Sequence, residues 1–348
     1  MEAHFTNVPL WEPVVREIAR REKIGYKVIE AGDPGSSAVF LLDKKYVVKI
    51  FPPEHTGDAD VEAAVLNALL EDPLIPVPHL YAKGVECILG WPYLLMSCVS
   101  GVALRELLPH LDLKELERVA GDLGRIVYSM HRLEDGLEPT LAPFDRGWSD
   151  TVAAMEVDRT QALQTLQDLA THSPDNAWVH ELADAMEAEW DFLLSGPGML
   201  VNRDLTEDHV YLIESAGRWQ LSGLIDFSDA AVRPCELDWH DLRFWAFARH
   251  VSPMRTFLGS YYDRPVVEQD LRRSFLSACV CRTRIVDYGP TYRPINYRKS
   301  NCFTISRKSF GQGQSAEMTR PKIKYLKTTG IRRCPGLYDI LLLSVVLF

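Results

Sequence analysis

The sequence has few cysteines, and they are not spaced as metal ligands usually are. Its seven cysteines are scattered along 348 residues without one Cys-x-x-Cys pair, which leaves a zinc ribbon without ligands. An odd number fits reduced thiols better than a disulfide framework. No apolar run approaches the roughly 18 residues that a membrane-spanning helix needs. The first residues contain no basic segment followed by an apolar stretch, so we expect a cytoplasmic protein without membrane contact.

Positive charge is also scarce in most of the chain. The net charge of −10 argues against a general nucleic-acid binder. Residues 281–348 reverse the trend, because they hold 13 Lys or Arg and three Asp or Glu, whereas residues 1–280 have a net charge of −20. This basic segment has no sustained periodicity, so we predict a poorly ordered, atypical tail. A tail that binds acidic partners is the alternative.

The first hundred residues carry mainly strand signals. Short apolar runs of strand length are joined by the charged turn Asp43-Lys44-Lys45, which predicts a hairpin. One amphipathic helix, capped by Asp58 or Asp60, interrupts the runs. The predicted elements are a helix over 8–21, strands over Ala38–Leu42 and Tyr46–Phe51, a helix ending near Leu70, and strands over His79–Val85 and Tyr93–Val99, in a sheet of about five strands.

After Gly101 the periodicity becomes mainly helical. Apolar residues recur at the spacing of a helix face from Leu113 to Met130. The further predictions are helices near 148–170 and 177–194, short strands over Met199–Val201, Val210–Ile213 and Trp219–Ile225, and helices from Glu236 to about Val280. A strand-rich first part and a helix-rich second part predict two unequal lobes with a cleft between them, for which the length and the 47% hydrophobic content suffice.

Two aspartates each follow an apolar run in the second part. Asp204 lies in LVNRDLTEDHVYLI and Asp226 in LSGLIDFSDA, with a predicted hairpin between them. A strand that ends in a carboxylate delivers that group into a cleft. Two such carboxylates can serve as a proton acceptor and a Mg²⁺ ligand, which is the pair that phosphoryl transfer needs.

The small lobe offers groups that suit phosphates. Lys49 lies in the apolar strand YVVKIF and therefore needs a partner, which Glu62 on the next helix can provide. The pair would direct Lys49 towards nucleotide phosphates. Gly32 and Gly35, in the turn AGDPGSS, allow the backbone to approach phosphate closely.

The order of these pieces resembles the aminoglycoside phosphotransferase and choline kinase-like family, small-molecule relatives of the protein kinases. LLDKKYVVKIF is similar to the strand of the ATP-contacting lysine, and VEAAVLNALLEDPLIPVPHL to the helix of its glutamate partner. WPYLLMSCVSG resembles the last strand and hinge of the small lobe. LVNRDLTEDHVYL takes the place of the catalytic loop, and LIDFSDA resembles the metal-binding IDFGDA segment. The resemblance covers about residues 25–280 and depends on the collinear series.

The resemblance implies an α+β, protein-kinase-like fold. Its parts would be a nucleotide-binding lobe of mixed sheet and helix (1–100), a mainly helical catalytic and substrate-binding lobe (101–280) and the basic tail (281–348). It implies that Asp204 is the catalytic base, that Asp226 binds the metal and that Asp238 supports the catalytic core. The cofactors would be ATP and Mg²⁺, with Mn²⁺ as an option. The implied nucleotide-binding residues are Gly32, Gly35, Ser36, Ser37, Lys49, Glu62, Met96, Ser97, Cys98 and Val99.

Three departures from the family pattern affect the implied site. Asn202 and Arg203 stand where His-Gly is usual, which concerns the support of the loop more than the chemistry. His209 replaces the asparagine that binds Mg²⁺, and a neutral imidazole would favour Mn²⁺ or Zn²⁺. The phosphate loop is short of the three-glycine kinase pattern, so hydroxyls or backbone amides of Ser36 and Ser37 must contribute.

We therefore expect an ATP-dependent phosphotransferase that acts on a hydroxyl of a small molecule. The acidic balance of residues 1–280 favours a cationic acceptor. Two alternatives remain: a pseudokinase that binds nucleotide or protein without transfer, suggested by Asn202 and His209, and an interaction protein that acts through its basic tail. The sequence leaves the acceptor and the oligomeric state open.

Overall fold

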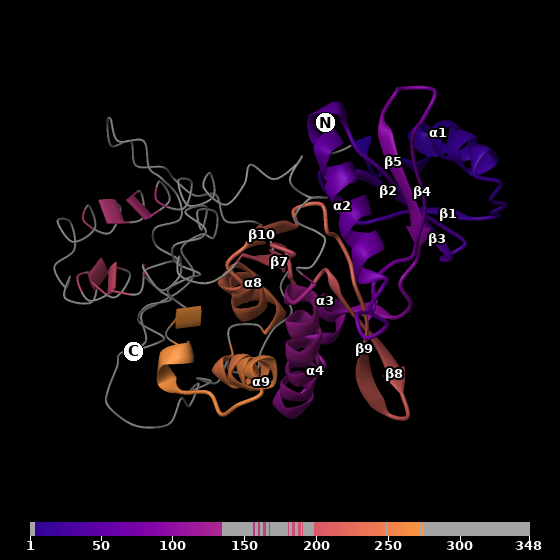
Figure 1. The fold of residues 1–348 in the computed structure, drawn as a ribbon. Coiled ribbons are helices and arrows are strands. Elements are labelled where there is room, and N and C mark those ends of the chain that lie inside the picture. The colour runs from indigo at the N-terminus through magenta and orange to yellow at the C-terminus, as the bar shows by residue number, and fades with distance from the viewer. Residues whose placement is uncertain are drawn as a thin grey trace, which may run out of the picture. The chain divides into compact units, whose positions relative to one another are not determined.

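The computed structural model describes residues 4–133, 198–247 and 250–274 apart from residue 272, with isolated residues between 156 and 190 (Figure 1). The described residues of 4–160 and 184–274 belong to one compact unit. The predicted basic tail lies outside the described residues. The described positions within the two helices predicted between 148 and 194 are helical. No helix in the described part of the chain is long and apolar enough to cross a membrane.

The small lobe contains one antiparallel five-stranded sheet. Strands β1 (Ile29–Ala31), β2 (Ala38–Leu42), β3 (Tyr46–Ile50), β4 (Leu80–Val85) and β5 (Pro92–Ser97) follow the order β1-β2-β3-β5-β4. Helices α1 (Val8–Arg21) and α2 (Thr56–Leu69) lie on opposite faces of this sheet (Figure 1). The predicted hairpin and five-stranded sheet are therefore confirmed.

The alternation of side chains along β3 determines which face each residue occupies. Val48 and Ile50 point into the core beneath α1, whereas Val47 and Phe51 pack in the core that includes α2. Lys49 lies between Val48 and Ile50 and thus shares the α2 face, opposite Val39 and Leu94 on the neighbouring strands. This register directs a single charged side chain at α2.

The predicted caps of the second helix are wrong. The chain forms a 3-10 turn over Pro53–His55, and α2 begins directly after it at Thr56. The Asp58 carboxylate contacts His55 Nδ1 at 2.7 Å, and the Asp60 carboxylate pairs with Lys83 of β4. Proline provides a fixed φ that suits the first turn of a helix, so Pro53 starts the helical segment earlier than an acidic cap would.

The chain enters the second lobe through Gly101. This glycine has φ +112°, and a Cβ placed there would lie 2.2 Å from the Leu212 carbonyl oxygen. Only glycine fits this conformation at such a close approach. The elements that follow are β6 (Val102–Ala103), α3 (Leu104–Leu107), α4 (Leu113–His131), β7 (Met199–Val201), β8 (Val210–Ser215), β9 (Arg218–Leu224), β10 (Ala231–Arg233), α8 (Glu236–Asp241), a π-helical turn (Leu242–Ala246) and α9 (Val251–Tyr262).

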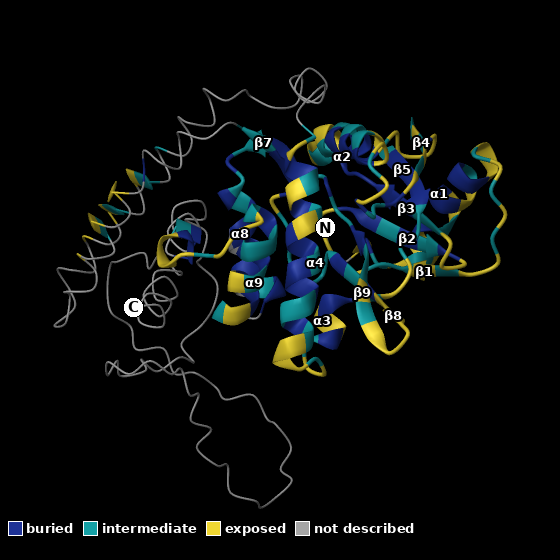
Figure 2. Ribbon diagram, turned by 60° about the horizontal axis from the view of Figure 1, so that its bottom comes forward, coloured by how far each residue is buried: buried dark blue, intermediate teal, exposed yellow. Residues whose placement is uncertain are grey.

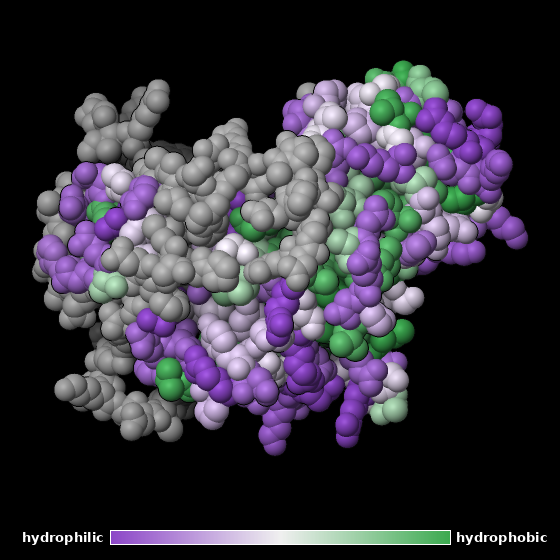
Figure 3. Space-filling view, in the orientation of Figure 1, coloured by the Kyte–Doolittle hydropathy of each residue, from purple (hydrophilic) through white to green (hydrophobic). Residues whose placement is uncertain are grey.

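These elements place the carboxylate-bearing loops together. β8 and β9 form the predicted hairpin, β8 also pairs with β6, and β7 pairs with β10. Helix α4 carries both buried and exposed residues, as the amphipathic pattern predicts (Figure 2). Polar residues cover much of the visible described surface, and apolar ones form smaller patches (Figure 3).

Two glycines of α4 test how tightly α4 and α9 pack. A Cβ at Gly124 would lie 2.4 Å from the Phe257 carbonyl oxygen, which is a backbone atom and cannot move aside. A Cβ at Gly121 would meet side-chain atoms of Ser260 and Thr256 at 3.3 and 3.4 Å. We expect Gly124→Ala to lower the free energy of unfolding by about 2 kcal/mol through overpacking.

The Gly121→Ala variant is the matched control in the same helix. Its better helix propensity offsets the mild crowding, so its free energy of unfolding should change by less than about 1 kcal/mol. Urea denaturation of the two variants beside the wild type measures both values. Equal losses in the two variants would show that the close contact of α4 with α9 does not limit stability.

Candidate active site

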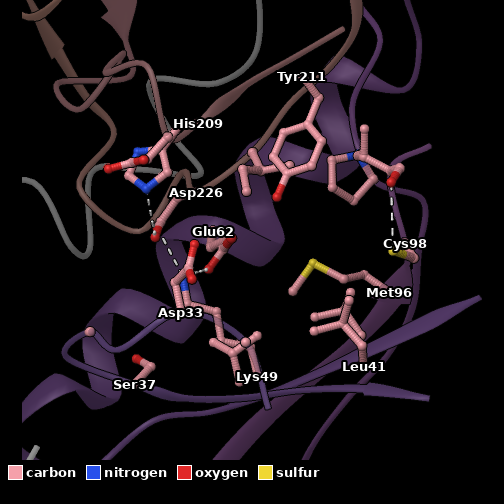
Figure 4. Close-up of a pocket in the computed structure, with 18 of the residues that line it drawn as sticks. Asp33, Ser37, Leu41, Lys49, Glu62, Met96, Cys98, His209, Tyr211 and Asp226 are labelled. Carbon is pink, nitrogen blue, oxygen red and sulfur yellow. Dashed lines mark hydrogen bonds and ion pairs between the residues drawn. The ribbon is translucent and has the colours of Figure 1, made fainter. Parts of the chain in front are cut away.

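A cavity of about 360 Å³ lies among the loop 31–37, strands β2, β3 and β5, and the segments on both sides of the β8–β9 hairpin (Figure 4). Its polar end is formed by groups such as Lys49, Asp226 and His209, and Met96 and Tyr211 lie towards its other end. Every predicted nucleotide-binding residue lines it, as do both predicted metal ligands: Gly32, Gly35, Ser36, Ser37, Lys49, Glu62, Met96, Ser97, Cys98, Val99, His209 and Asp226.

Lys49 is the electrostatic centre of the polar end. Its Nζ lies 2.8 Å from Glu62 Oε2 on α2 and 2.8 Å from Asp226 Oδ1 beyond β9. Lys49 and Glu62 are almost fully buried. Burial alone would lower the pKa of Lys49, but the carboxylates of Glu62 and Asp226 raise that pKa above its ordinary value. The ammonium group is therefore charged at neutral pH.

Asp226 is held by contacts from three directions. Burial would raise the pKa of its carboxyl, but the Lys49 ammonium, together with His209 and the hydrogen bond from Ser228, keeps the pKa well below the ordinary range. Its Oδ1 accepts a hydrogen bond from Ser228 Oγ at 2.6 Å, and its backbone carbonyl accepts one from Asn202 Nδ2 at 2.8 Å. Its φ of +59° lies in the left-handed region, which turns the chain sharply after β9.

A buried carboxylate organises the loop that contains Asp204. The Asp238 side chain accepts hydrogen bonds from the backbone N–H groups of Asn202 at 3.1 Å and Arg203 at 2.7 Å. It also contacts His131 Nε2 at 2.9 Å, and both side chains are fully buried. Arg203 has φ +70°, a conformation that these bonds help to hold.

Asn202, which stands where the family pattern has histidine, supports this loop with its side chain. Its amide NH₂ donates to the Asp226 carbonyl, and its side-chain oxygen accepts from the Asp204 backbone N–H at 2.9 Å. One side chain therefore connects the two aspartate-bearing segments. Asn202 therefore contributes to the support of the loop, and the expectation that the departure leaves the chemistry intact stays a prediction.

His209 lies between the two aspartates. Its Nδ1 is 2.7 Å from the Asp204 backbone carbonyl and 3.3 Å from Asp204 Oδ2, while its Nε2 is 3.9 Å from Asp226 Oδ2. A carbonyl only accepts, so Nδ1 donates, and the lone pair of the neutral imidazole is on Nε2, towards Asp226. Asp204 itself does not line the cavity and lies on the other side of the His209 ring.

The donor set around His209 fits a divalent cation only in part. An imidazole nitrogen and a carboxylate oxygen face the same space, and the other imidazole nitrogen donates to a carbonyl, as metal-binding histidines usually do. Within the described residues, no cluster of three or more His, Cys, Asp or Glu side chains could hold an ion alone. A metal here would therefore need ligands from a phosphate group and water, which is usual for Mg²⁺.

Sequence reasoning did not assign Asp33, Arg105 or Tyr211 to the site, although all three line the cavity. Arg105 Nη1 lies 2.7 Å from Asp208 Oδ1, and Arg105 Nη2 lies 3.0 Å from Asp33 Oδ2. Asp33 and Tyr211 lie inside motifs that the sequence analysis quoted but were given no role there, and Arg105 lies in none of those motifs. Only the glycine spacing of the loop 32–35 pointed to their neighbourhood.

The other walls of the cavity are apolar. Aliphatic side chains from the small-lobe sheet and from the end of β9 surround the space between the hinge and Lys49. A planar aromatic group suits such a lining, whereas its charged substituents would lie towards the polar end. The apolar lining residues are Val39, Leu41, Val47, Pro78, Met96, Val99 and Ile225.

Comparison with known proteins supports a specific family. A family model described as "Phosphotransferase enzyme family" matches residues 28–268. No curated protein matches the chain.

Several solved structures share the fold. A GDP complex of aminoglycoside 2'-phosphotransferase-IIIa has 17% identity and a TM-score of 0.57, over 76% of this chain and 86% of that one. The GDP and kanamycin complex of APH(2")-IIia gives 17% and 0.56, over 76% and 87%. The ADP and streptomycin complex of APH(3'')-Id from Streptomyces rimosus gives 17% and 0.51, over 79% and 99%. The predicted protein-kinase-like fold is thus confirmed.

The buried Lys49 ion pairs lead to a pH-dependent prediction. Lys49→Met leaves the Glu62 carboxylate buried without its cation, which should lower the free energy of unfolding by about 3 kcal/mol at pH 8. Burial raises the pKa of Glu62, and Lys49 opposes that rise in the wild type. Without Lys49 the folded state takes up a proton more readily than the unfolded state, so the loss should shrink as the pH falls from 8 to 5.5.

Urea denaturation at both pH values measures this effect. In the double variant Lys49→Met/Glu62→Gln the buried carboxylate is replaced by a neutral amide, so most of the difference between pH 5.5 and pH 8 should disappear. An equal loss at both pH values in the single variant would show that Glu62 does not depend on Lys49 to stay ionised.

Proposed function

Because the chain belongs to the phosphotransferase enzyme family, we propose that it transfers the γ-phosphoryl group of ATP to a hydroxyl of a small, cationic molecule. The observation that carries this proposal is the buried contact of Lys49 with both Glu62 and Asp226 at the polar end of a cavity with apolar walls. That cavity suits an adenine ring at one end and phosphates at the other.

In this proposal the cavity residues position the nucleotide. Lys49 contacts the α- and β-phosphates, and Glu62 holds its ammonium group in place. The loop that contains Gly32, Gly35, Ser36 and Ser37 covers the phosphates with backbone amides and hydroxyls. The hinge residues Met96, Ser97, Cys98 and Val99 lie at the adenine end. Positioning and electrostatic stabilisation then supply most of the rate enhancement, as in other phosphoryl transfers.

Asp204 is the residue that we assign to the acceptor. It lies outside the nucleotide cavity and is separated from Asp226 by the His209 ring, so a hydroxyl beside it would face the terminal phosphate. Its carboxylate orients the acceptor hydroxyl and accepts the proton as the new phosphoester bond forms. The Asp204 backbone N–H is fixed by Asn202, and the loop is held by Asp238.

Asp226 and His209 would hold the divalent cation together with the nucleotide phosphates. When bound, the ion neutralises phosphate charge during transfer. Carboxylate oxygen suits Mg²⁺, but the imidazole Nε2 shifts the preference towards Mn²⁺. We therefore propose Mg²⁺ as a usable ion and Mn²⁺ as the more tightly bound one.

Two observations support a cationic acceptor. The solved relatives were crystallised with the aminoglycosides kanamycin and streptomycin, which carry several positive groups. Residues 1–280 of this chain have a net charge of −20, which favours the approach of cations.

Substitution of the two aspartates separates binding from transfer. Asp226→Asn should abolish the rise in melting temperature that ATP with Mg²⁺ produces, because the metal loses its carboxylate. Asp204→Asn should keep that rise but lower phosphoryl transfer about 10³-fold, because the hydroxyl loses its proton acceptor. Thermal melting and transfer of labelled γ-phosphate to kanamycin, gentamicin and streptomycin are the two measurements.

Asp229→Asn is the matched control, since Asp229 is exposed and only three residues beyond Asp226. It should behave as the wild type in both assays. Wild-type protein that binds ATP but never transfers phosphate would favour the pseudokinase. Wild-type protein that does not bind ATP with either metal would contradict the proposed nucleotide site.

His209→Asn tests the metal preference. Binding of Mn²⁺ to the protein–ADP complex can be followed by the electron paramagnetic resonance signal of free Mn²⁺, in competition with Mg²⁺. The wild type should require a larger excess of Mg²⁺ to displace Mn²⁺ than His209→Asn does, because an amide oxygen discriminates less between these ions. An unchanged displacement ratio would show that His209 is not a ligand.

A further inference from the structure

Arg105 connects the two sides of the cavity. It belongs to α3, directly after the hinge, and its backbone N–H donates to the Glu207 carbonyl at 2.9 Å. Its guanidinium pairs with Asp208 beside His209 and with Asp33 of the loop that covers the cavity. The hydrogen bond to Glu207 fixes the backbone of Arg105 next to the segment that contains His209. Its side chain extends from there to Asp33 in the covering loop.

The charges of the cavity make this arginine unusual. The lining residues include four carboxylates, Asp33, Glu62, Asp208 and Asp226, but only two permanent cations. Lys49 is already engaged with Glu62 and Asp226. Among the described lining residues, Arg105 is therefore the only other permanent cation that can bind a polyphosphate, and the Asp33 carboxylate would repel one.

The ion pairs of Arg105 are suited to exchange. Asp33 is 73% exposed, Arg105 47% and Asp208 38%, so water screens these contacts and each stabilises the fold only weakly. A phosphate group binds a guanidinium through two parallel hydrogen bonds and carries more charge than one carboxylate. Phosphate can therefore displace the more exposed partner, Asp33.

We propose that Arg105 binds the terminal phosphates of the nucleotide. Its guanidinium then releases Asp33 and contacts the phosphates instead, while Nη1 stays paired with Asp208. In the structure, Asp33 pairs with the guanidinium group of Arg105 and so connects the covering loop to α3. This inference rests on the proposed function, because it requires a nucleotide in this cavity. It adds a residue that approaches the phosphates from the large-lobe side, opposite Lys49.

Isothermal titration calorimetry with ATP and with AMP, both in Mg²⁺, tests the assignment. Arg105→Ala should raise the Kd of ATP about tenfold or more, the usual effect of losing hydrogen bonds to a charged group, and leave the Kd of AMP within about twofold. Asp33→Asn should lower the Kd of ATP, because it removes a competitor and a repelling charge. Arg125→Ala is the matched control, since Arg125 is an exposed arginine of α4 that pairs with Asp122.

The direction in which Asp33→Asn changes the Kd of ATP distinguishes the proposed exchange from a fixed Arg105–Asp33 contact. If Arg105 only held the loop closed through Asp33, both variants would weaken ATP binding, and that result would overturn the proposal. An unchanged Kd of ATP in Arg105→Ala, or an equal loss for AMP, would overturn it as well. Retained AMP binding shows that each variant is folded. If the wild type binds neither nucleotide, the proposed function itself fails.

Discussion

The contact of one buried ammonium group with two carboxylates joins the parts of this structure that carry the site. Lys49 comes from the central strand of the small lobe, Glu62 from the helix on one face of its sheet, and Asp226 from the end of β9 in the other lobe. A charge buried between apolar neighbours is costly unless it is paired. The pairing therefore brings side chains from β3, from α2 and from the segment after β9 together at the polar end of the cavity.

The loop that contains Asp204 depends on a second buried polar group. Asp238, fully enclosed and in contact with His131, fixes two consecutive backbone amides of the loop that precedes Asp204. Asn202 then links that loop to Asp226. These contacts explain how the chain tolerates Asn202 and Arg203 where its family usually has other residues: the loop is supported through backbone hydrogen bonds, which do not require the usual side chains.

The excess of negative charge in the cavity is informative about its ligand. Carboxylates that face one another across a small space need cations, and the described lining residues supply Lys49 and Arg105. A nucleotide polyphosphate adds more negative charge. The proposed complex therefore needs divalent cations and the pairing of Arg105 with phosphate. The imidazole Nε2 of His209 and the Asp226 carboxylate lie 3.9 Å apart and face the same space, which is where the proposed complex places the divalent cation.

The sequence by itself determined most of the strands, the long helices and the predicted nucleotide-binding residues that line the cavity, because local periodicity and a collinear series of motifs encode them. It did not determine the start of α2, where a proline turn replaced the expected acidic cap. It also did not reveal Arg105, Asp33 or the link through Asn202. These contacts join residues more than 20, and in one case more than 100, positions apart, with no spacing rule between them. Only tertiary packing brings such groups within hydrogen-bonding distance, since the burial of both cores fixes where the loops meet.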